Sequence, residues 1–102
     1  MEERDQTILI VRYHDACRVL PPHKYVYKGD QITFRTIKTA ATILIPNPQL
    51  FTTGQQSINI DPGKDVTLTV GDPGSGVYPY AVFCDATNDF ALGGSSPDLI
   101  VY

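Results

Sequence analysis

Two cysteines and two histidines are the residues of this chain whose types could carry metal or redox chemistry. His14, Cys17 and His23 follow one another closely, whereas Cys84 stands far away at the end of an aromatic segment. Thiolate and imidazole groups are ligands that suit zinc or Cu(I). The cysteines could also be reduced core thiols or a disulfide that spans the fold. Reduced thiols are the expected state, because a free cysteine is commonly buried as a small apolar residue and a cytosolic compartment would keep both reduced.

Other catalytic and binding motifs are missing from the sequence. It contains no paired-cysteine motif, no Gly-x-Gly-x-x-Gly phosphate loop and no nucleophile elbow. The glycine-rich stretch 71–76 lies between predicted strands with no helix after it, so we expect a loop there and not a phosphate site. Asp85, Asn88, Asp89 and Asp98 lack the spacing of a calcium loop and predict a solvated polar face. We therefore predict no catalytic residues, no cofactor and a protein that is not an enzyme.

Size and charge restrict the partners that we expect. The 102 residues predict a single domain, 1–102, with one core. The formal net charge is −3 and no run of Lys and Arg marks a polyanion-binding face, so we expect no nucleic-acid partner. No apolar stretch approaches membrane-spanning length, so we expect no membrane insertion. The charged start 1–6 predicts a cytoplasmic protein as the sequence is written, or a periplasmic or secreted one if a signal peptide has been removed.

The hydrophobic pattern has period two and predicts an all-β fold. Turn signals at 28–30 and 61–64, each with a glycine, separate the predicted strands. Leu50 and Phe51, beyond a Pro-Asn-Pro stop, are expected to tuck back into the core. The predicted strands are 7–13, 19–22, 25–27, 32–34, 42–45, 57–60, 66–70, 78–84 and 98–102. This number of short strands indicates a two-sheet sandwich or a small barrel.

Three segments resemble the cupredoxin family, the plastocyanin and azurin type of β-sandwich. Residues 19–21 with 25–34 are similar to the family's early strand pair. Residues 80–84 are similar to its penultimate strand, which ends in a cysteine, and 99–101 to its closing strand. The resemblance implies a Greek-key β-sandwich of about seven to eight strands, with loops 35–41, 47–54 and 85–97 at the end that the family uses for metal and partner contact.

The resemblance also implies which residues would hold copper. Blue copper needs two imidazoles, a thiolate and a weak axial thioether. By position Cys84 matches the thiolate, but the histidine positions fall within 39–42 and 85–88, the axial position falls near Leu92, and the only methionine is Met1. The standard site is therefore absent. Cys84 could instead hold zinc or Cu(I) together with Cys17 and His14 or His23. These three residues follow the first predicted strand, and in the family the loop after that strand lies at the copper end.

The favoured function is a non-enzymatic binding or structural module with an unidentified protein partner and weak homo-oligomerisation through a sheet edge. Exposed tyrosines would favour such a contact. The competing function is metal binding or thiol redox chemistry at Cys84 with Cys17, His14 or His23. The rival fold is an immunoglobulin-like sandwich with a Cys17–Cys84 disulfide, weakened by the absence of tryptophan and the loop-like surroundings of Cys17. For the binding module, we expect Cys84→Ser to cost only modest stability.

Overall fold

The computed structural model describes residues 6–14, 16–91 and 97–102. Strands dominate this part of the chain, and it contains no helix with the length and apolarity needed to cross a membrane. The strands are β1 (Thr7–Tyr13), β2 (Ala16–Leu20), β3 (His23–Val26), β4 (Gln31–Ile37), β5 (Ala41–Leu44), β6 (Ser57–Ile60), β7 (Asp65–Thr69), β8 (Gly76–Pro79), β9 (Ala81–Cys84), β10 (Asp89–Phe90) and β11 (Asp98–Val101).

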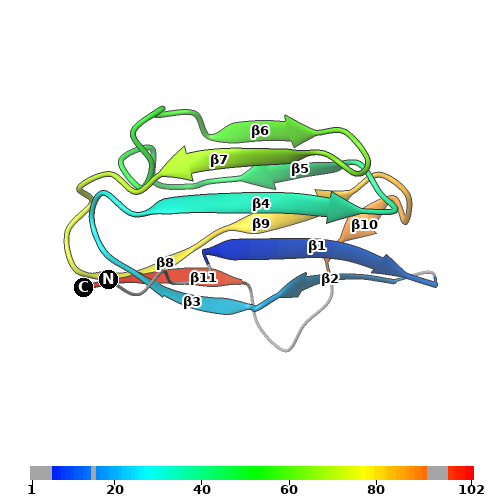
Figure 1. The fold of residues 1–102 in the computed structure, drawn as a ribbon, viewed down its shortest axis with the longest axis horizontal. Coiled ribbons are helices and arrows are strands. Elements are labelled where there is room, and N and C mark those ends of the chain that lie inside the picture. Colours follow the sequence, from blue (N-terminus) through cyan, green and yellow to red (C-terminus); the bar gives the residue numbers. More distant parts are fainter. Residues whose placement is uncertain (1–5, 15, 92–96) are drawn as a thin grey trace.

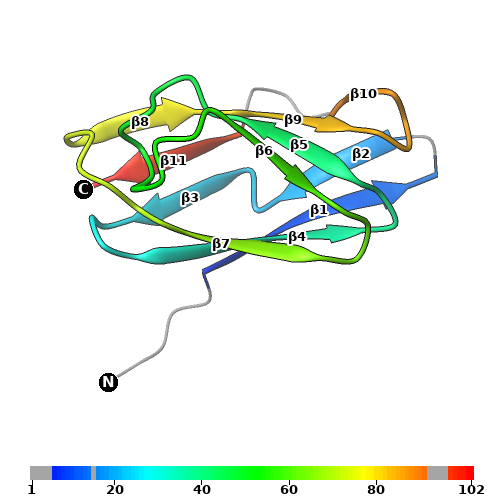
Figure 2. The same cartoon turned by 90° about the horizontal axis from the view of Figure 1, so that it is seen from above.

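The strands form two layers (Figures 1 and 2). One layer is the sheet β2-β1-β4-β7, in which β1 and β4 are parallel. The other combines the sheets β10-β9-β5-β6 and β3-β11-β8, because only Tyr80 separates β8 from β9. The chain passes from the first layer to the second between β2 and β3, at a cis Leu20–Pro21 peptide bond. The prediction of an all-β sandwich is confirmed, and the larger strand number arises from these interrupted strands and the two-residue β10.

Alternation along the strands builds one core between the layers. In β1 the side chains of Ile8 and Ile10 are fully buried, while their neighbours are half-buried or exposed. Side chains of a strand point alternately to the two faces, so every second residue reaches the core. Leu50 and Phe51 are buried, as the sequence predicted, and the isolated bridge between Phe51 and Val70 holds their loop against the sandwich.

The loops divide between the two ends of the sandwich, and here one prediction was wrong. At one end, on the right in Figure 1, the backbone N–H of Asp85 donates to the Ala40 carbonyl at 3.0 Å, which joins the β4–β5 and β9–β10 connections. Loop 47–54 was expected beside them. It lies at the opposite end, where the Gly71 N–H donates to the Leu50 carbonyl at 2.7 Å, because β5 carries the chain away before this loop begins. Of the predicted loop 85–97, residues 92–96 lie outside the described residues.

Candidate functional site

The residues that correspond to a copper centre by position do lie together. Cys84 ends β9 and pairs with Ala41 at the start of β5, so the segment before β5 meets the segment after β9. The Ala86 N–H donates to the Thr39 hydroxyl at 3.2 Å, and that hydroxyl donates to the Ala40 carbonyl at 2.7 Å. Hydroxyl and backbone groups that are already bonded to one another thus stand where imidazoles would be needed, and a blue-copper centre does not fit this donor set.

The two cysteines form a disulfide, which corrects the expectation of reduced thiols. Alternation along β2 and β9 turns both Cys17 and Cys84 toward the core, where their exposed fractions are 1% and 0%. Their Cα atoms are 6.5 Å apart, and the bond links the two layers. Cys17 lies in strand β2, so the expectation of loop-like surroundings, one of the two arguments against the disulfide, was wrong. A disulfide sulfur is not the thiolate that binds metals.

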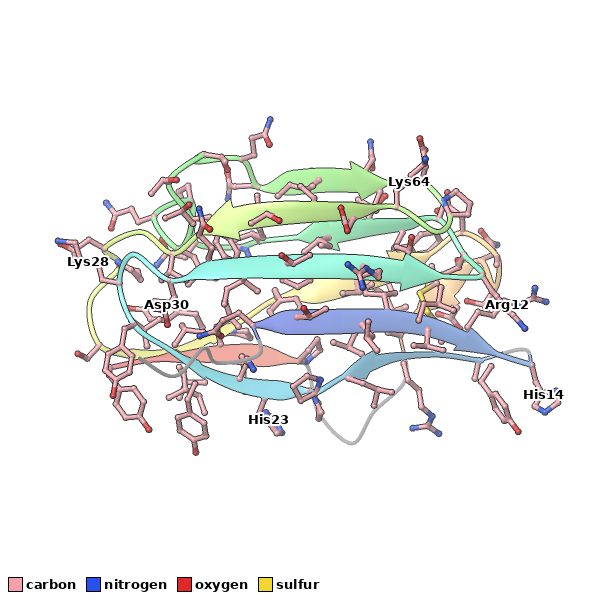
Figure 3. All side chains as sticks on the ribbon, viewed as in Figure 1. Arg12, His14, His23, Lys28, Asp30 and Lys64 are labelled. Carbon is pink, nitrogen blue, oxygen red and sulfur yellow. A yellow bond between two sulfur atoms is a disulfide. The ribbon has the colours of Figure 1, made fainter. Side chains whose placement is uncertain are left out.

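The two histidines do not join the cysteines at one place. His14 lies in the turn after β1, where its ring contacts that of Tyr13 edge-on at a centroid distance of 4.3 Å. His23 begins β3, and its Nδ1 lies 2.9 Å from a carboxylate oxygen of Asp98 on the neighbouring β11. Figure 3 shows the two histidines well apart. Within residues 6–14, 16–91 and 97–102, no group of three or more His, Cys, Asp and Glu side chains could hold a metal ion.

A surface feature that the sequence did not specify is a stack of three exposed tyrosines. The Tyr102 ring lies between those of Tyr25 and Tyr27, at centroid distances of 5.6 and 5.0 Å and interplanar angles of 22° and 27°. The exposed fractions are 55% for Tyr25, 50% for Tyr27 and 59% for Tyr102. We call this set the tyrosine stack. The parallel pairing of β3 with β11 places these residues on one outward face. The signal in the sequence was their alternation with the buried Val26 and Val101.

Further apolar side chains extend this face across the third sheet. Tyr25, Ile100 and Val77 form one register row over β3, β11 and β8, and Val77 is 60% exposed. The next row contains His23 and Asp98, and the His23 Nδ1 lies 2.9 Å from an Asp98 carboxylate oxygen. The outward face of β3-β11-β8 is therefore mostly apolar and aromatic, and we call it the tyrosine face.

Tyr80 is the titratable residue with the most perturbed environment among the described ones. Its ring is buried and meets the Phe34 ring edge-on at 5.6 Å. Its hydroxyl has no hydrogen-bond partner within the described residues. Burial raises the pKa of this phenol well above its usual range, and the negative charge of Asp98 raises it further. Tyr80 is a core residue and does not open to a site.

Comparison with solved structures decides the family of the fold. A reduced amicyanin variant superposes with a TM-score of 0.56 at 14% identity, over 99% of this chain and 87% of that one. A purple cupredoxin from Nitrosopumilus maritimus gives a TM-score of 0.56 at 14% identity, over 96% of this chain and all of the other. The fold is a cupredoxin-like β-sandwich. At this identity the likeness concerns the fold alone, and the sequence matches no protein-family model and no curated protein.

Of the two sandwich folds considered from the sequence, cupredoxin-like and immunoglobulin-like, the comparisons support the cupredoxin-like one. The immunoglobulin-like alternative is not the better supported fold, since an amicyanin and a purple cupredoxin superpose over nearly the whole chain. The disulfide that was linked to that alternative is nevertheless present. In this cupredoxin-like chain Cys84 is bonded to Cys17, at the strand end where the resemblance placed a copper thiolate.

Proposed function

We propose that this chain is a non-enzymatic protein-interaction module that binds its partner through the tyrosine face. The observation that carries the proposal is the tyrosine stack, three large aromatic side chains that are each about half exposed on one sheet face. Exposed apolar residues that occur singly need no explanation, but a contiguous patch on one face marks an interaction site. Tyrosine is also enriched where protein interfaces have most of their binding energy.

The chemistry of this face indicates the kind of partner. Stacked rings hold one another in place, so little side-chain entropy remains to be lost on binding. Their hydroxyls can both donate and accept hydrogen bonds at the rim. The His23 ring and the Asp98 carboxylate already contact each other, so this pair does not require a charged partner. We therefore infer that the partner is a protein surface that is apolar at its centre and contributes uncharged hydrogen-bonding groups at its edge.

The non-enzymatic part of the proposal has separate support. Catalytic groups commonly have perturbed pKa values and lie in clefts. The residue whose pKa the protein clearly raises is Tyr80, and its side chain is buried in the core. The cysteine that could act as a nucleophile is bonded to a second cysteine.

Thiol redox chemistry is a second candidate, favoured by the pairing of Cys17 with Cys84. Its weakness is that exchange requires an accessible sulfur, whereas both cysteines are buried. The interaction module therefore remains the better supported function.

The test compares two triple variants of the oxidised protein. Tyr25→Ser, Tyr27→Ser and Tyr102→Ser remove the tyrosine stack, while Tyr13→Ser, Leu44→Ser and Phe90→Ser remove three exposed apolar side chains elsewhere. Proteins captured by the wild-type chain are purified, and their affinity for each variant is measured by calorimetry. We expect the first variant to bind at least about 100-fold more weakly, since hot-spot residues contribute about 2 kcal/mol or more each. Equal affinity for the first variant and the wild type would contradict the proposal.

Self-association is measured on the same variants by sedimentation at several concentrations. A dimer of the wild type that is lost in the tyrosine variant would identify a second copy of the chain as the partner. A dimer that persists in this variant would place the contact elsewhere, for example at the sheet edge that the sequence suggested.

A further inference from the structure

One end of the sandwich gathers positive charge in an acidic protein. Arg12 and Tyr13 at the end of β1, His14 in the turn after it and Lys38 in the β4–β5 connection line an open hollow of about 300 Å³. Figure 3 shows Arg12 and His14 projecting at this end. The Arg12 Nε donates to the His14 carbonyl at 3.0 Å, which fixes the guanidinium and leaves its two terminal nitrogens to face the hollow or solvent.

Among residues 6–14, 16–91 and 97–102, the two permanent cations of this hollow, Arg12 and Lys38, are not part of an ion pair. Among the described residues the ion pairs join Lys28 with Asp72, Arg35 with Asp65 and His23 with Asp98. Two exposed cations that line one hollow create a positive potential there, in contrast to the formal net charge of −3 of the whole chain.

The ends of β1 and β4 bring these two cations to the same hollow. β1 and β4 are parallel, and Val11 with Ile37 is the last pair of their ladder. Arg12 follows Val11 in β1, and Lys38 follows Ile37 directly after β4. Like charges that line one hollow repel each other, and an anion bound between them would reduce this repulsion.

The backbone at the hollow is held in an uncommon conformation. His14 has φ of 58° and Lys38 has φ of 64°, the left-handed region that residues with a Cβ atom usually avoid. Strained residues of this kind gather at functional sites, where the surrounding structure holds them. Both of them line the same hollow.

We propose that this hollow binds a dianionic phosphoryl group, as inorganic phosphate or as the head of a small phosphate monoester. A guanidinium supplies paired donors that match phosphate oxygens, and an ammonium supplies a point charge. The His14 imidazole and the Tyr13 hydroxyl provide further hydrogen-bonding groups on the wall. A volume of about 300 Å³ is at the lower end of the range for small-molecule sites, so there is room for a short organic group beside the phosphate.

Backbone amide NMR on the full oxidised chain tests this site. Sodium phosphate is added at constant ionic strength, with sodium chloride as the reference. We expect saturable shifts that are concentrated on residues 12–14, 38 and 39 and that weaken between about 10 mM and about 0.15 M ionic strength, because exposed charges are screened by salt. Shifts that match those of chloride, or that spread equally to Lys28 and Lys64, would overturn the proposal.

Two double variants with the same change of net charge complete the test. Arg12→Gln with Lys38→Asn removes both cations of the hollow, and asparagine suits the left-handed conformation at position 38. Lys28→Gln with Lys64→Gln is the control, since neither of these lysines lines the hollow. We expect the first variant to bind phosphate at least about tenfold more weakly, because hydrogen bonds to charged groups are worth that much or more. Unchanged affinity in the first variant contradicts the site.

Glycerol phosphate, titrated in parallel, distinguishes the two sources of the phosphoryl group. Tighter binding than inorganic phosphate, with additional shifts at Tyr13, assigns the site to a monoester. Equal or weaker binding assigns it to free phosphate.

Discussion

The disulfide gives the sharpest prediction for stability. Replacing both cysteines by alanine, as Cys17→Ala with Cys84→Ala, removes the bond between the two layers without leaving an unpaired thiol. A disulfide stabilises a protein mainly by restricting the unfolded chain, and the effect grows with the length of the loop it closes. The sequence separation here is 67, which corresponds to about 4 kcal/mol of unfolding free energy at 25 °C.

This magnitude is large beside the stability of a small domain, which is about 5–15 kcal/mol. Unfolding entropy of about 2.1 cal/mol/K per residue converts it to a fall in Tm of about 20 °C for a chain of this length. It also changes an expectation from the sequence. Cys84→Ser was expected to cost only modest stability, but the bond to Cys17 means that a single substitution already removes the whole cross-link.

The assay is urea unfolding of three samples, the oxidised wild type, the reduced wild type and the double alanine variant, followed by circular dichroism. The reduced wild type keeps both buried sulfur atoms, so it separates the loss of the cross-link from the loss of packing. We expect the reduced protein to lose about 4 kcal/mol, and the variant to lose this amount together with the packing of the two buried sulfur atoms. A loss below about 1 kcal/mol in the reduced protein would refute the reasoning, because it would mean that the bond does not constrain the unfolded chain.

Two further substitutions test the packing of the core and of the loop beyond β5. Tyr80→Phe removes a buried hydroxyl without a described partner, so we expect a gain of about 1 kcal/mol in thermal or urea unfolding. Since the pKa of Tyr80 is raised in the folded protein, wild-type stability should fall as pH rises above about 10, and this fall should shrink in the variant. Gly71→Ala would place a Cβ 2.5 Å from the Gln49 carbonyl oxygen, so we expect a loss of about 1–3 kcal/mol by urea unfolding. A gain of stability with Gly71→Ala would show that the loop is not held there.

Much of the fold could be predicted because its strands follow period two. Segments 7–13 and 57–60 coincide with β1 and β6, and Gly29 and Gly63 lie in the two predicted turns, where both have positive φ. Cys17 was misplaced because its neighbours Asp15, Ala16 and Arg18 have low strand propensity. Pairing with β1 places it in a strand nonetheless, since tertiary contacts outweigh local preference.

The candidate site was harder to predict than the fold. The positions 39–42 and 85–88 do meet around Cys84, as the cupredoxin resemblance implied. The pairing of the cysteines could not be derived from two residues, because redox state depends on the compartment and on geometry. The hollow at Arg12 and Lys38 depends on a parallel pairing between distant strands, which alternation within each strand does not specify.

Metal titration tests the central claim, that this is a cupredoxin-like sandwich in which Cys84 is a disulfide partner and not a metal ligand. Tag-free oxidised protein is titrated with Cu(II) and Zn(II), and with Cu(I) under anaerobic conditions, and is followed by visible absorption and native mass spectrometry. We predict no tight one-to-one complex and no copper–thiolate absorption. Tight stoichiometric binding that disappears in the Cys17→Ala, Cys84→Ala variant would contradict the account, because it would mean that the cysteines are metal ligands.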